Sequence, residues 1–314
     1  MQSSLFVVDT IDQSDSAKNF ISGLLEEFKL NFLVDADDCC ILVARNQHGV
    51  GGIGILVAEK RGQSTMFIKW LHVKKLWRKL SVASVLIQHL ESYCLDNGIS
   101  TISVMFDQKN DGMHSLTRRT HGWSAGEMLA AYTFSAKGAL APALIRGESA
   151  IEKRNLQACI VPLSECDHQD ILRAAETKDL PEWAQLDQLL LGKASQELSR
   201  VFYCKNHIVG WLITFPLTTD TLEYRILWVD QEHRQTGIIV RALVEVMRAA
   251  HLQQSPKLQH ESGELCCPWR KGFFMVHAGN QGMINWSKKR LSRGKYQEYS
   301  LMHRKKIVEK SLAW

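Results

Sequence analysis

Residues 227–250 begin with Leu227-Trp228-Val229, continue with Arg234-Gln235-Thr236-Gly237-Ile238-Ile239, and end in an apolar helical pattern. The same design occurs 156 residues earlier. There, residues 71–94 begin with Leu71-His72-Val73, continue with Arg78-Lys79-Leu80-Ser81-Val82-Ala83, and end in another such pattern. Each stretch predicts a strand that runs into a tight turn and opens a helix. Because the offset is about half of the 314 residues, the sequence predicts that one structural unit is duplicated.

The two helical patterns stay in register at this offset. Their apolar residues recur with the i, i+3, i+4, i+7 spacing of a stripe that faces a core. The equivalent pairs are Val82 and Ile238, Ala83 and Ile239, Leu86 and Ala242, Ile87 and Leu243, Leu90 and Val246, and Cys94 and Ala250. Any two amphipathic helices can be slid into register. Here, however, the preceding strand and the arginine of the turn fall into line as well.

The composition is that of a globular domain protein, with 45% hydrophobic and 23% charged residues. No stretch approaches the roughly 18 uninterrupted apolar residues of a membrane span. The first residues do not combine a basic region with an apolar run, so we expect no secretory signal. A cytoplasmic location is therefore expected.

The eight cysteines are expected to be reduced thiols in apolar surroundings. They include the vicinal pairs Cys39-Cys40 and Cys266-Cys267, but no Cys-x-x-Cys pair. This spacing matches no common zinc site and no disulfide framework. We therefore expect no metal site.

The formal net charge of +5 is modest, but cations gather near the C-terminal end of the sequence. Residues 285–314 contain Lys288, Lys289, Arg290, Arg293, Lys295, Arg304, Lys305, Lys306 and Lys310, against Glu298 and Glu309. One interpretation is a solvated basic surface. The other is a docking face for an anionic partner, which would be a nucleotide phosphate, an acidic carrier protein or RNA.

The order of predicted elements is the same in both halves. In the first half we expect helices at residues 15–28, 81–95 and 114–120, and strands at 40–45, 50–58, 66–73, 99–106 and 128–134. In the second half we expect helices at 164–175, 237–250 and 281–291, and strands at 200–204, 208–214, 222–229, 272–277 and 296–303. A polar insertion covers residues 253–270.

A boundary between the halves is predicted where Lys137-Gly138 and Arg146-Gly147 carry breaking signals. The expected organisation is an N-terminal domain at residues 1–140, a linker at 141–157 and a C-terminal domain at 158–314.

A strand followed by Arg/Gln-x-x-Gly-x-Gly/Ala and a helix resembles the acyl-CoA signature of the GNAT family, the Gcn5-related N-acyltransferases. The chain is similar to a tandem pair of these domains over nearly its whole length. The resemblance also includes Val50-Gly51 and Val209-Gly210, which follow the first turn of each strand pair. It implies an α/β fold with two consecutive GNAT-like domains, each a mixed, mostly antiparallel sheet flanked by helices.

The chemistry of the turn agrees with this resemblance. The first N–H groups of a helix have no intrahelical partner and lie at the positive end of the helix dipole, so they suit a pyrophosphate. A small residue allows close approach, and the arginine adds a charged donor. The expected cofactor-binding residues are Val229 and Arg234 to Ile239 in the second half, and Val73 and Arg78 to Ala83 in the first. The expected co-substrate is acyl-CoA, with acetyl-CoA as the first choice.

Neither copy of the turn matches the signature fully. The second keeps Gly237 but has Ile239 in place of the small third residue. The first has Ser81 in place of glycine and keeps Ala83.

Three residues are candidates for catalysis. Glu223 lies eleven residues before Arg234, where some members of the family carry a general base, and the same count in the first half gives Phe67. His72 and His277 lie late on predicted strands and could accept a proton. Each has an alternative interpretation: a solvent-facing carboxylate for Glu223, and an ordinary hydrogen-bonded strand histidine for His72 and His277.

The resemblance also implies a tyrosine that protonates the leaving thiolate, but this chain has Ser287 and Arg118 at the two expected places. One hypothesis is an N-acyltransferase that acts on an amine of a small molecule or peptide, with the second half favoured because Gly237 and Glu223 lie there. The alternatives are a transferase that uses an acyl carrier protein or aminoacyl-tRNA, and a non-catalytic tandem GNAT binding module. No membrane partner is expected.

Overall fold

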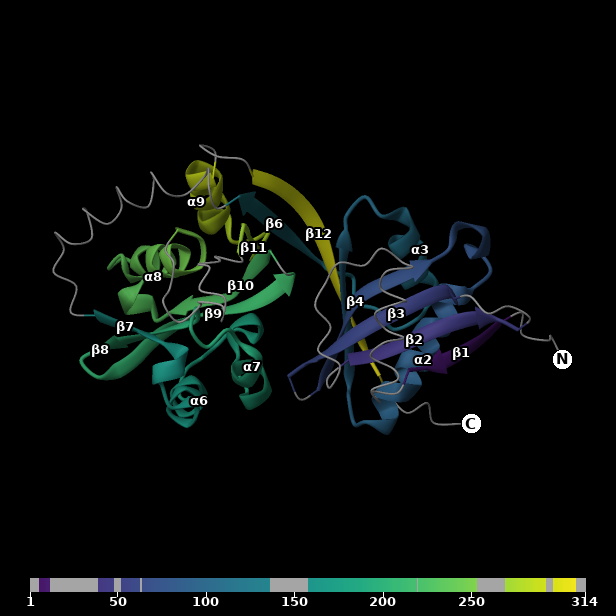
Figure 1. Ribbon diagram of the computed structural model, residues 1–314, viewed down its shortest axis with the longest axis horizontal. Helices are drawn as coiled ribbons and strands as arrows, with labels where there is room; N and C mark the ends of the chain where they lie inside the picture. Colours follow the sequence, from purple (N-terminus) through teal and green to yellow (C-terminus); the bar gives the residue numbers. More distant parts are fainter. Residues whose placement is uncertain are drawn as a thin grey trace, which may run out of the picture. The chain divides into compact units, whose positions relative to one another are not determined.

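The computed structural model describes residues 6–11, 39–47, 52–62, 64–135, 158–218, 220–252, 269–291 and 296–308 (Figure 1). The chain forms two compact units. The first unit consists of Met1–Met128 and Ser300–Trp314, and the second of Leu129–Tyr299. Among the helices of the described residues, none is long and apolar enough to cross a bilayer.

The first unit is a mixed sheet with strand order β1-β2-β3-β4-β5-β12. Neighbouring strands are antiparallel except for the parallel pair β4 and β5. The strands are β1 (Phe6–Thr10), β2 (Cys39–Asn46), β3 (Gly52–Arg61), β4 (Thr65–Val73), β5 (Thr101–Asp107) and β12 (Tyr296–Ile307), and the helices are α2 (Val82–Asp96) and α3 (Asp111–Arg119). The buried stripe of α2, namely Val82, Leu86, Ile87, Leu90 and Cys94, packs on the sheet, as its spacing predicts.

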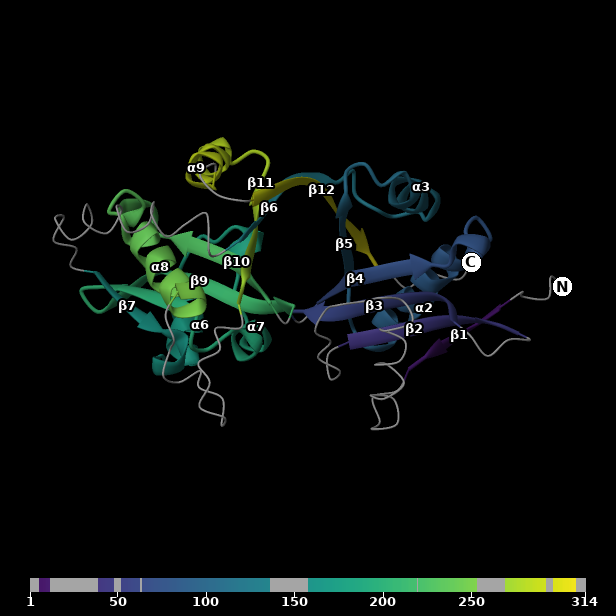
Figure 2. The same ribbon diagram turned by 45° about the horizontal axis from the view of Figure 1, so that its top comes forward.

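The second unit repeats this plan with strand order β6-β11-β10-β9-β8-β7. Only β10 and β11 are parallel. The strands are β6 (Glu127–Ser135), β7 (Ala158–Pro162), β8 (Arg200–Cys204), β9 (His207–Thr218), β10 (Thr221–Val229) and β11 (Lys271–His277). The helices are α6 (His168–Glu176), α7 (Gln188–Lys193), α8 (Ile238–Met247) and α9 (Gln281–Leu291). One core includes residues of α8 and α9, the other residues of α6 and α7 (Figure 2), so helices cover both faces of this sheet.

The final strand of each half pairs with the sheet of the other half. β6 runs antiparallel to β11, from Leu129 opposite His277 to Ser135 opposite Lys271. β12 runs antiparallel to β5, from Leu301 opposite Asp107 to Ile307 opposite Thr101. If the chain were divided into consecutive domains at 1–140 and 158–314, β6 and β12 would each be assigned to a domain other than the one whose sheet they join. The predicted linker at 141–157 lies wholly outside the described residues.

An ion pair fixes the exchanged strand β12 in the first unit. Lys306, which is 9% exposed, places its Nζ 2.8 Å from Oε1 of Glu91 on α2. A lysine is rarely buried unless it is paired, so this contact explains how a cation fits beneath the helix.

The predicted fold class is confirmed: each unit is a mixed, mostly antiparallel sheet flanked by helices. The structure adds the short strands β1 and β7 and the helix α7. Helix α8 ends at Met247 and continues as a π-helical turn to Leu252, past the expected end at Ala250. The expected helix at 15–28 and most of the insertion at 253–270 lie outside the described residues.

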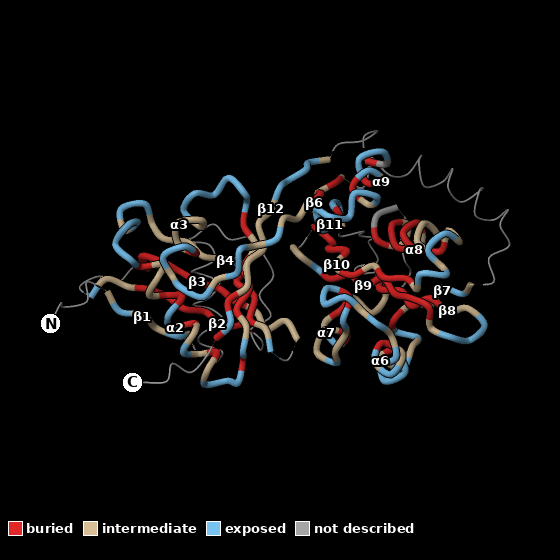
Figure 3. The backbone as a smooth tube through the Cα atoms, turned by 180° about the vertical axis from the view of Figure 1, so that it is seen from behind, coloured by how far each residue is buried: buried red, intermediate tan, exposed pale blue. Residues whose placement is uncertain are grey.

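Burial follows the central strands of both sheets (Figure 3). β2 and β10 are buried over most of their length, and so are Gly52–Ala58 of β3 and Val209–Phe215 of β9. Strands covered on both faces are apolar without alternation, which is the pattern of residues 40–45 and 209–215. The turns that lead from β4 and β10 into the helices remain at the surface.

Candidate functional site

Each turn ends in a left-handed residue directly before its helix, but the backbones differ earlier: Arg78 is extended and Lys79 has φ 68°, whereas Arg234 is helical. After β4, a 3-10 turn (Lys75–Trp77) leads to Ser81, which precedes α2 in the left-handed conformation at φ 62°. After β10, a 3-10 turn (Gln231–His233) leads to Gly237, which precedes α8 in the same conformation at φ 92°. Ser81 therefore adopts the backbone for which the signature uses glycine. This costs a residue with a side chain about 1 kcal/mol or more.

The arginine of each turn closes the loop onto its strand. Arg78 Nε donates to the carbonyl oxygen of Val73 at 3.0 Å. Arg234 Nε donates to the carbonyl oxygen of Val229 at 3.1 Å. Each contact uses one of the five N–H donors of a guanidinium and ties the turn to the last residue of the strand. The same bond in both units supports the repeat at the level of single atoms.

The amide groups that open the helices differ in one respect. In the second unit, Ile238 N–H donates to Thr236 Oγ1 at 3.4 Å, and the hydroxyl of Thr236 donates to the carbonyl of His233 at 2.7 Å. Leu80 occupies the equivalent position in the first unit and has no hydroxyl. The first amide of α8 therefore has an internal acceptor, which a phosphate would have to displace.

The charges of the two turns differ strongly. Residues 74–80 contain four cations and no acid, which gives a formal charge of +4; the cations are Lys74, Lys75, Arg78 and Lys79. Residues 230–236 contain one cation and two acids, which gives −1 with His233 neutral. Asp230 binds Lys178 at 2.6 Å, so the second turn is close to neutral. The first turn is the more favourable place for an anion.

Strands β4 and β5 pair only over their first halves, as do β10 and β11. The parallel ladder ends at Ile68 opposite Val104 in the first unit, and at Tyr224 opposite Phe274 in the second. All four strands continue for three or more residues beyond this point. We call the end of each ladder the splay. In the GNAT family, the pantetheine arm of acyl-CoA enters between the two strands equivalent to these.

A β-bulge follows directly on each splay. The pairing of β3 with β4 skips Lys69, and the pairing of β9 with β10 skips Arg225. These two residues are equivalent at the offset of 156. A bulge bends its strand and often lies beside an active site.

Glu223 lies just before the second bulge and is 2% exposed. Its Oε2 accepts hydrogen bonds from Arg225, at 2.6 Å from Nη2 and 3.0 Å from Nε. Two donors of one guanidinium therefore engage a single oxygen of this carboxylate. Glu223 is thus placed at the splay but is engaged in an ion pair.

His72 lies near the end of β4 and is half-buried. Burial, followed by the charges of Arg78 and Lys74, lowers the pKa of His72 below its ordinary value of 6.5. The imidazole is therefore neutral at neutral pH, the form that accepts a proton. His277, in contrast, is exposed at the end of β11, and its Nδ1 accepts from the N–H of Gly279 at 3.1 Å.

Neither of the two residues at the positions expected for tyrosine, Ser287 and Arg118, has a phenolic side chain. Ser287 on α9 is fully buried, and its hydroxyl has no hydrogen-bond partner within the described part of the chain. Arg118 on α3 is exposed. It lines a surface pocket together with Gln108, Asp111, His114, Ser115 and Arg119.

Two tryptophans fill the face of the second sheet that α6 and α7 cover. Trp211 and Trp228 stack with ring centroids 4.7 Å apart and are 0% and 6% exposed. The equivalent residues in the first unit are Ile55 and His72, which face each other across β3 and β4. Near its end, β10 therefore carries a packed indole ring. At the equivalent position, β4 carries the imidazole of His72.

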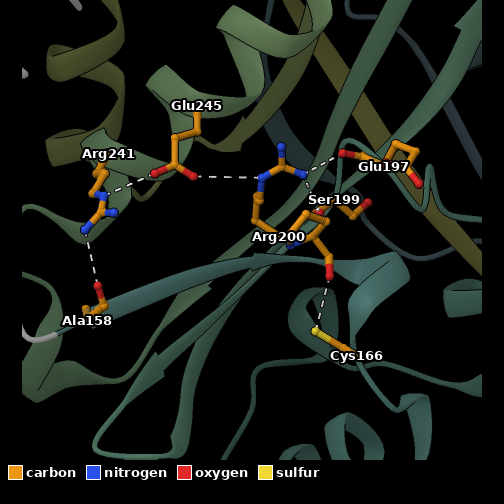
Figure 4. Close-up of polar contacts among 8 residues, drawn as sticks. Ala158, Cys166, Glu197, Ser199, Arg200, Arg241 and Glu245 are labelled. Atoms are coloured by element: carbon orange, nitrogen blue, oxygen red, sulfur yellow. Dashed lines mark hydrogen bonds and ion pairs between the residues drawn. The ribbon is translucent and has the colours of Figure 1, made fainter. Parts of the chain in front are cut away.

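Side chains on α8 tie this helix to the edge of its sheet (Figure 4). Arg241 binds Glu245 at 3.1 Å and donates to the carbonyl of Ala158 on β7 at 3.2 Å. Arg200 on β8 is 8% exposed, lies 4.0 Å from Glu245, and donates to the carbonyls of Glu197 and Ser199. Burial lowers the pKa of Arg200, and Glu245 opposes this effect. The network fixes the helix that begins at the second turn.

Residues 8–123 match the family profile described as the acetyltransferase (GNAT) family. This part of the chain is a GNAT-family domain. The profile lies within the first half of the sequence, and the solved structures below share their fold with the second half as well. A search of curated protein sequences gives no match.

Solved structures resemble this chain over its full length. A tandem GNAT protein from the clavulanic acid biosynthesis pathway aligns over 98% of this chain and 99% of its own, with a TM-score of 0.60 and 11% identity. A GCN5-related N-acetyltransferase from Sphaerobacter thermophilus aligns over 100% and 99%, with a TM-score of 0.58 and 12% identity.

A third similar structure is a glucosamine N-acetyltransferase region in a fungal multi-domain GH3 β-N-acetylglucosaminidase. It aligns over 96% of this chain but 38% of its own, with a TM-score of 0.62 and 13% identity. At these identities the likeness shows the tandem GNAT fold. It does not transfer a substrate.

Proposed function

We propose that this GNAT protein transfers an acyl group, acetyl in the first instance, from acyl-CoA to an amine, and that its first unit holds the donor. The charge of the first turn carries this proposal. Coenzyme A bears a pyrophosphate and a further phosphate, and residues 74–80 supply four cations around the start of α2. The sequence favours the second half for this role because of Gly237 and Glu223. The neutral turn and the ion-paired Glu223 support the first half instead.

His72 is the general base that we propose for the first unit. The acceptor amine attacks the thioester carbonyl, a C–N bond forms, and the C–S bond breaks. The amine proton passes to the neutral imidazole, and the thiolate leaves. His72 lies on the strand that runs from the splay to the turn, so donor and base share one element.

A matched pair of substitutions tests which turn binds the cofactor. Leu80→Asp and Thr236→Asp place a carboxylate at equivalent positions before the two helices. An acid at a helix start is favourable to the helix but repels phosphate. At Thr236, aspartate can also accept the Ile238 amide bond. We expect Leu80→Asp to weaken CoA binding at least tenfold in calorimetry and Thr236→Asp to leave it within twofold.

The opposite pattern would move the binding site to the second unit. If the unaltered protein binds no acyl-CoA, the proposed reaction is contradicted. Turnover of a thioester with any amine would exclude the non-catalytic alternative.

One observation favours a second candidate, in which the acyl group arrives on an acidic carrier protein. Leu76 is 90% exposed and Leu80 is 45% exposed, and both lie among the four cations of the first turn. Apolar side chains ringed by one sign of charge suit a partner of the opposite charge. In this case Leu76→Ser would slow turnover with an acyl carrier protein and leave turnover with acyl-CoA unchanged.

The basic segment near the end of the sequence gives only weak support to the alternative in which aminoacyl-tRNA is the donor. Lys288 is bound to Glu298 at 3.0 Å, and Lys306 is bound to Glu91 at 2.8 Å. These two cations are partly neutralised within the protein. Salt-dependent tRNA binding at low ionic strength would revive this proposal.

A further inference from the structure

The bulged cation in the first unit is held by a carboxylate from the neighbouring strand. Lys69 Nζ lies 2.8 Å from Glu59 Oε2, and Arg61 Nε lies 2.8 Å from Glu59 Oε1. Glu59 on β3 pairs directly with Phe67 on β4. The guanidinium of Arg61 covers the ring of Phe67 at 3.6 Å from its centroid.

In the second unit a glutamate also binds the bulged cation, but the guanidinium over the phenyl ring belongs to the bulged residue itself. Arg225 binds Glu223, which comes from its own strand, at 2.6 Å. Glu223 pairs directly with Phe215 on β9. The guanidinium of Arg225 covers the ring of Phe215 at 3.8 Å from its centroid.

The two arrangements are related by exchange of the residues in one cross-strand pair. At the offset of 156, Glu59 is equivalent to Phe215, and Phe67 is equivalent to Glu223. Each unit therefore keeps one glutamate, one phenylalanine and a cation on the bulge, but the glutamate and the phenylalanine have changed strands. The carboxylate is retained at the bulge although its position in the sequence is not.

We propose that Glu59 and Glu223 are positioning residues that hold the bulge in place and so fix where each splay begins. The strand that supplies the carboxylate is immaterial to this role. A bulge inserts one residue into a ladder, and it can shift along the strand unless something fixes it. A carboxylate that binds the bulged cation does this, because movement of the bulge would break the ion pair in a poorly hydrated site beside a phenyl ring.

For the first unit this inference extends the proposed function, because the pantetheine arm of acyl-CoA would enter at that splay. For the second unit it does not depend on any reaction. Variants of the second unit therefore test the role of the bulge alone, whereas variants of the first unit also test cofactor binding.

The decisive experiment transposes the pair. In the first unit, Glu59→Phe alone removes the carboxylate, whereas Glu59→Phe with Phe67→Glu moves it to the other strand, as in the second unit. We expect the single variant to increase amide hydrogen exchange at residues 66–71 at least tenfold and to raise KM for acyl-CoA. The double variant should return both quantities to within about threefold of the unaltered protein.

The second unit provides a version that needs no ligand. Glu223→Phe should lower the unfolding temperature and expose the amides around residue 225, and the added Phe215→Glu should restore both. If the double variants are as damaged as the single ones, the inference is wrong. If exchange behaves as expected but no acyl-CoA binds, the bulge inference stands and the proposed function fails.

A role as general base is distinguished by Glu59→Gln. Glutamine still accepts a hydrogen bond from Lys69, so a positioning role predicts a raised KM with kcat within about threefold and an unchanged pH profile. Loss of kcat by a factor of 100 or more, together with loss of the acidic limb of the profile, would overturn it.

Discussion

At the scale of single residues, the two units differ in the side chains at their candidate sites. His72 and Trp228 occupy equivalent positions; one is the imidazole that we propose as the proton acceptor, and the other is a packed indole. Ser81 and Gly237 are likewise equivalent, and both adopt the left-handed backbone. Equivalent positions with unequal side chains are what a duplicated fold with one working site would show.

The lowered pKa of His72 gives a pH prediction. Since the pKa of His72 is lowered in the folded protein, the acidic limb of kcat/KM should lie at a lower pH than the 6.5 of an ordinary histidine. His72→Gln should reduce kcat by a factor of about 100 to 10,000 and remove the acidic limb. A pH–rate series for both proteins measures this, and an unchanged profile in the variant would exclude His72 as the base.

The same group contributes to stability with a definite sign. The unfolded chain binds a proton at His72 more readily than the folded chain does. The contribution of His72 to the free energy of unfolding is therefore present above about pH 6.5, and it is lost as the pH falls through the pKa of His72 in the folded protein.

The sequence pattern located Glu223 by its distance from Arg234, but it did not predict the ion pair of Glu223 with Arg225. Arg225 lies on the bulge, and nothing in an apolar strand pattern marks a bulge. Glu59 was missed because it lies eight residues before Phe67, on another strand, and only the pairing of β3 with β4 brings them together. An alignment of Glu59 with Phe215 at the repeat offset was the signal that could have revealed the exchange.

At the scale of elements, the periodicities were sufficient for the long strands and helices. The expected helix at residues 281–291 coincides with α9, and the expected strand at 222–229 lies within β10. β1 and β7 were missed because each is a five-residue strand at the edge of its sheet, too short for a clear pattern.

The helix starts give a prediction for stability. Ser81 precedes α2 at φ 62°, and Gly237 precedes α8 at φ 92°. Ser81→Gly should stabilise the protein by about 0.5–1 kcal/mol because glycine adopts this backbone without strain, and Gly237→Ser should destabilise it by a similar amount. Thermal unfolding of the two variants measures both changes. A loss of stability in Ser81→Gly would mean that the serine side chain contributes more than its strain costs.

At the scale of the whole molecule, the exchange of β6 and β12 is the main departure from two consecutive domains. The repeat predicted that each half ends in a strand, which is correct. It could not assign the partner, because either final strand suits either sheet edge by its local pattern. Only pairing between residues far apart in the sequence decides this.

Cleavage between the halves tests the exchange. A protease site inserted after Arg146 should yield two fragments that remain together in gel filtration, since each contains a strand of the other's sheet. In about 6 M guanidinium chloride, where the strand pairing is lost, the fragments should separate. Separation of the cleaved fragments in native buffer would show that the strands are not exchanged in solution.

The exchanged strand β12 also has a consequence for how the protein is made. Asp107 on β5 and its partner Leu301 are 194 residues apart, so at about 5–20 residues per second a ribosome needs roughly 10–40 s to deliver the partner. During that time the edge of β5 presents free N–H and C=O groups. The next strand to emerge is β6, which belongs to the other sheet in the finished protein. Biosynthesis must therefore keep β5 open or undo an early pairing with β6, and chaperones that cover strand edges would raise the yield of correctly exchanged protein.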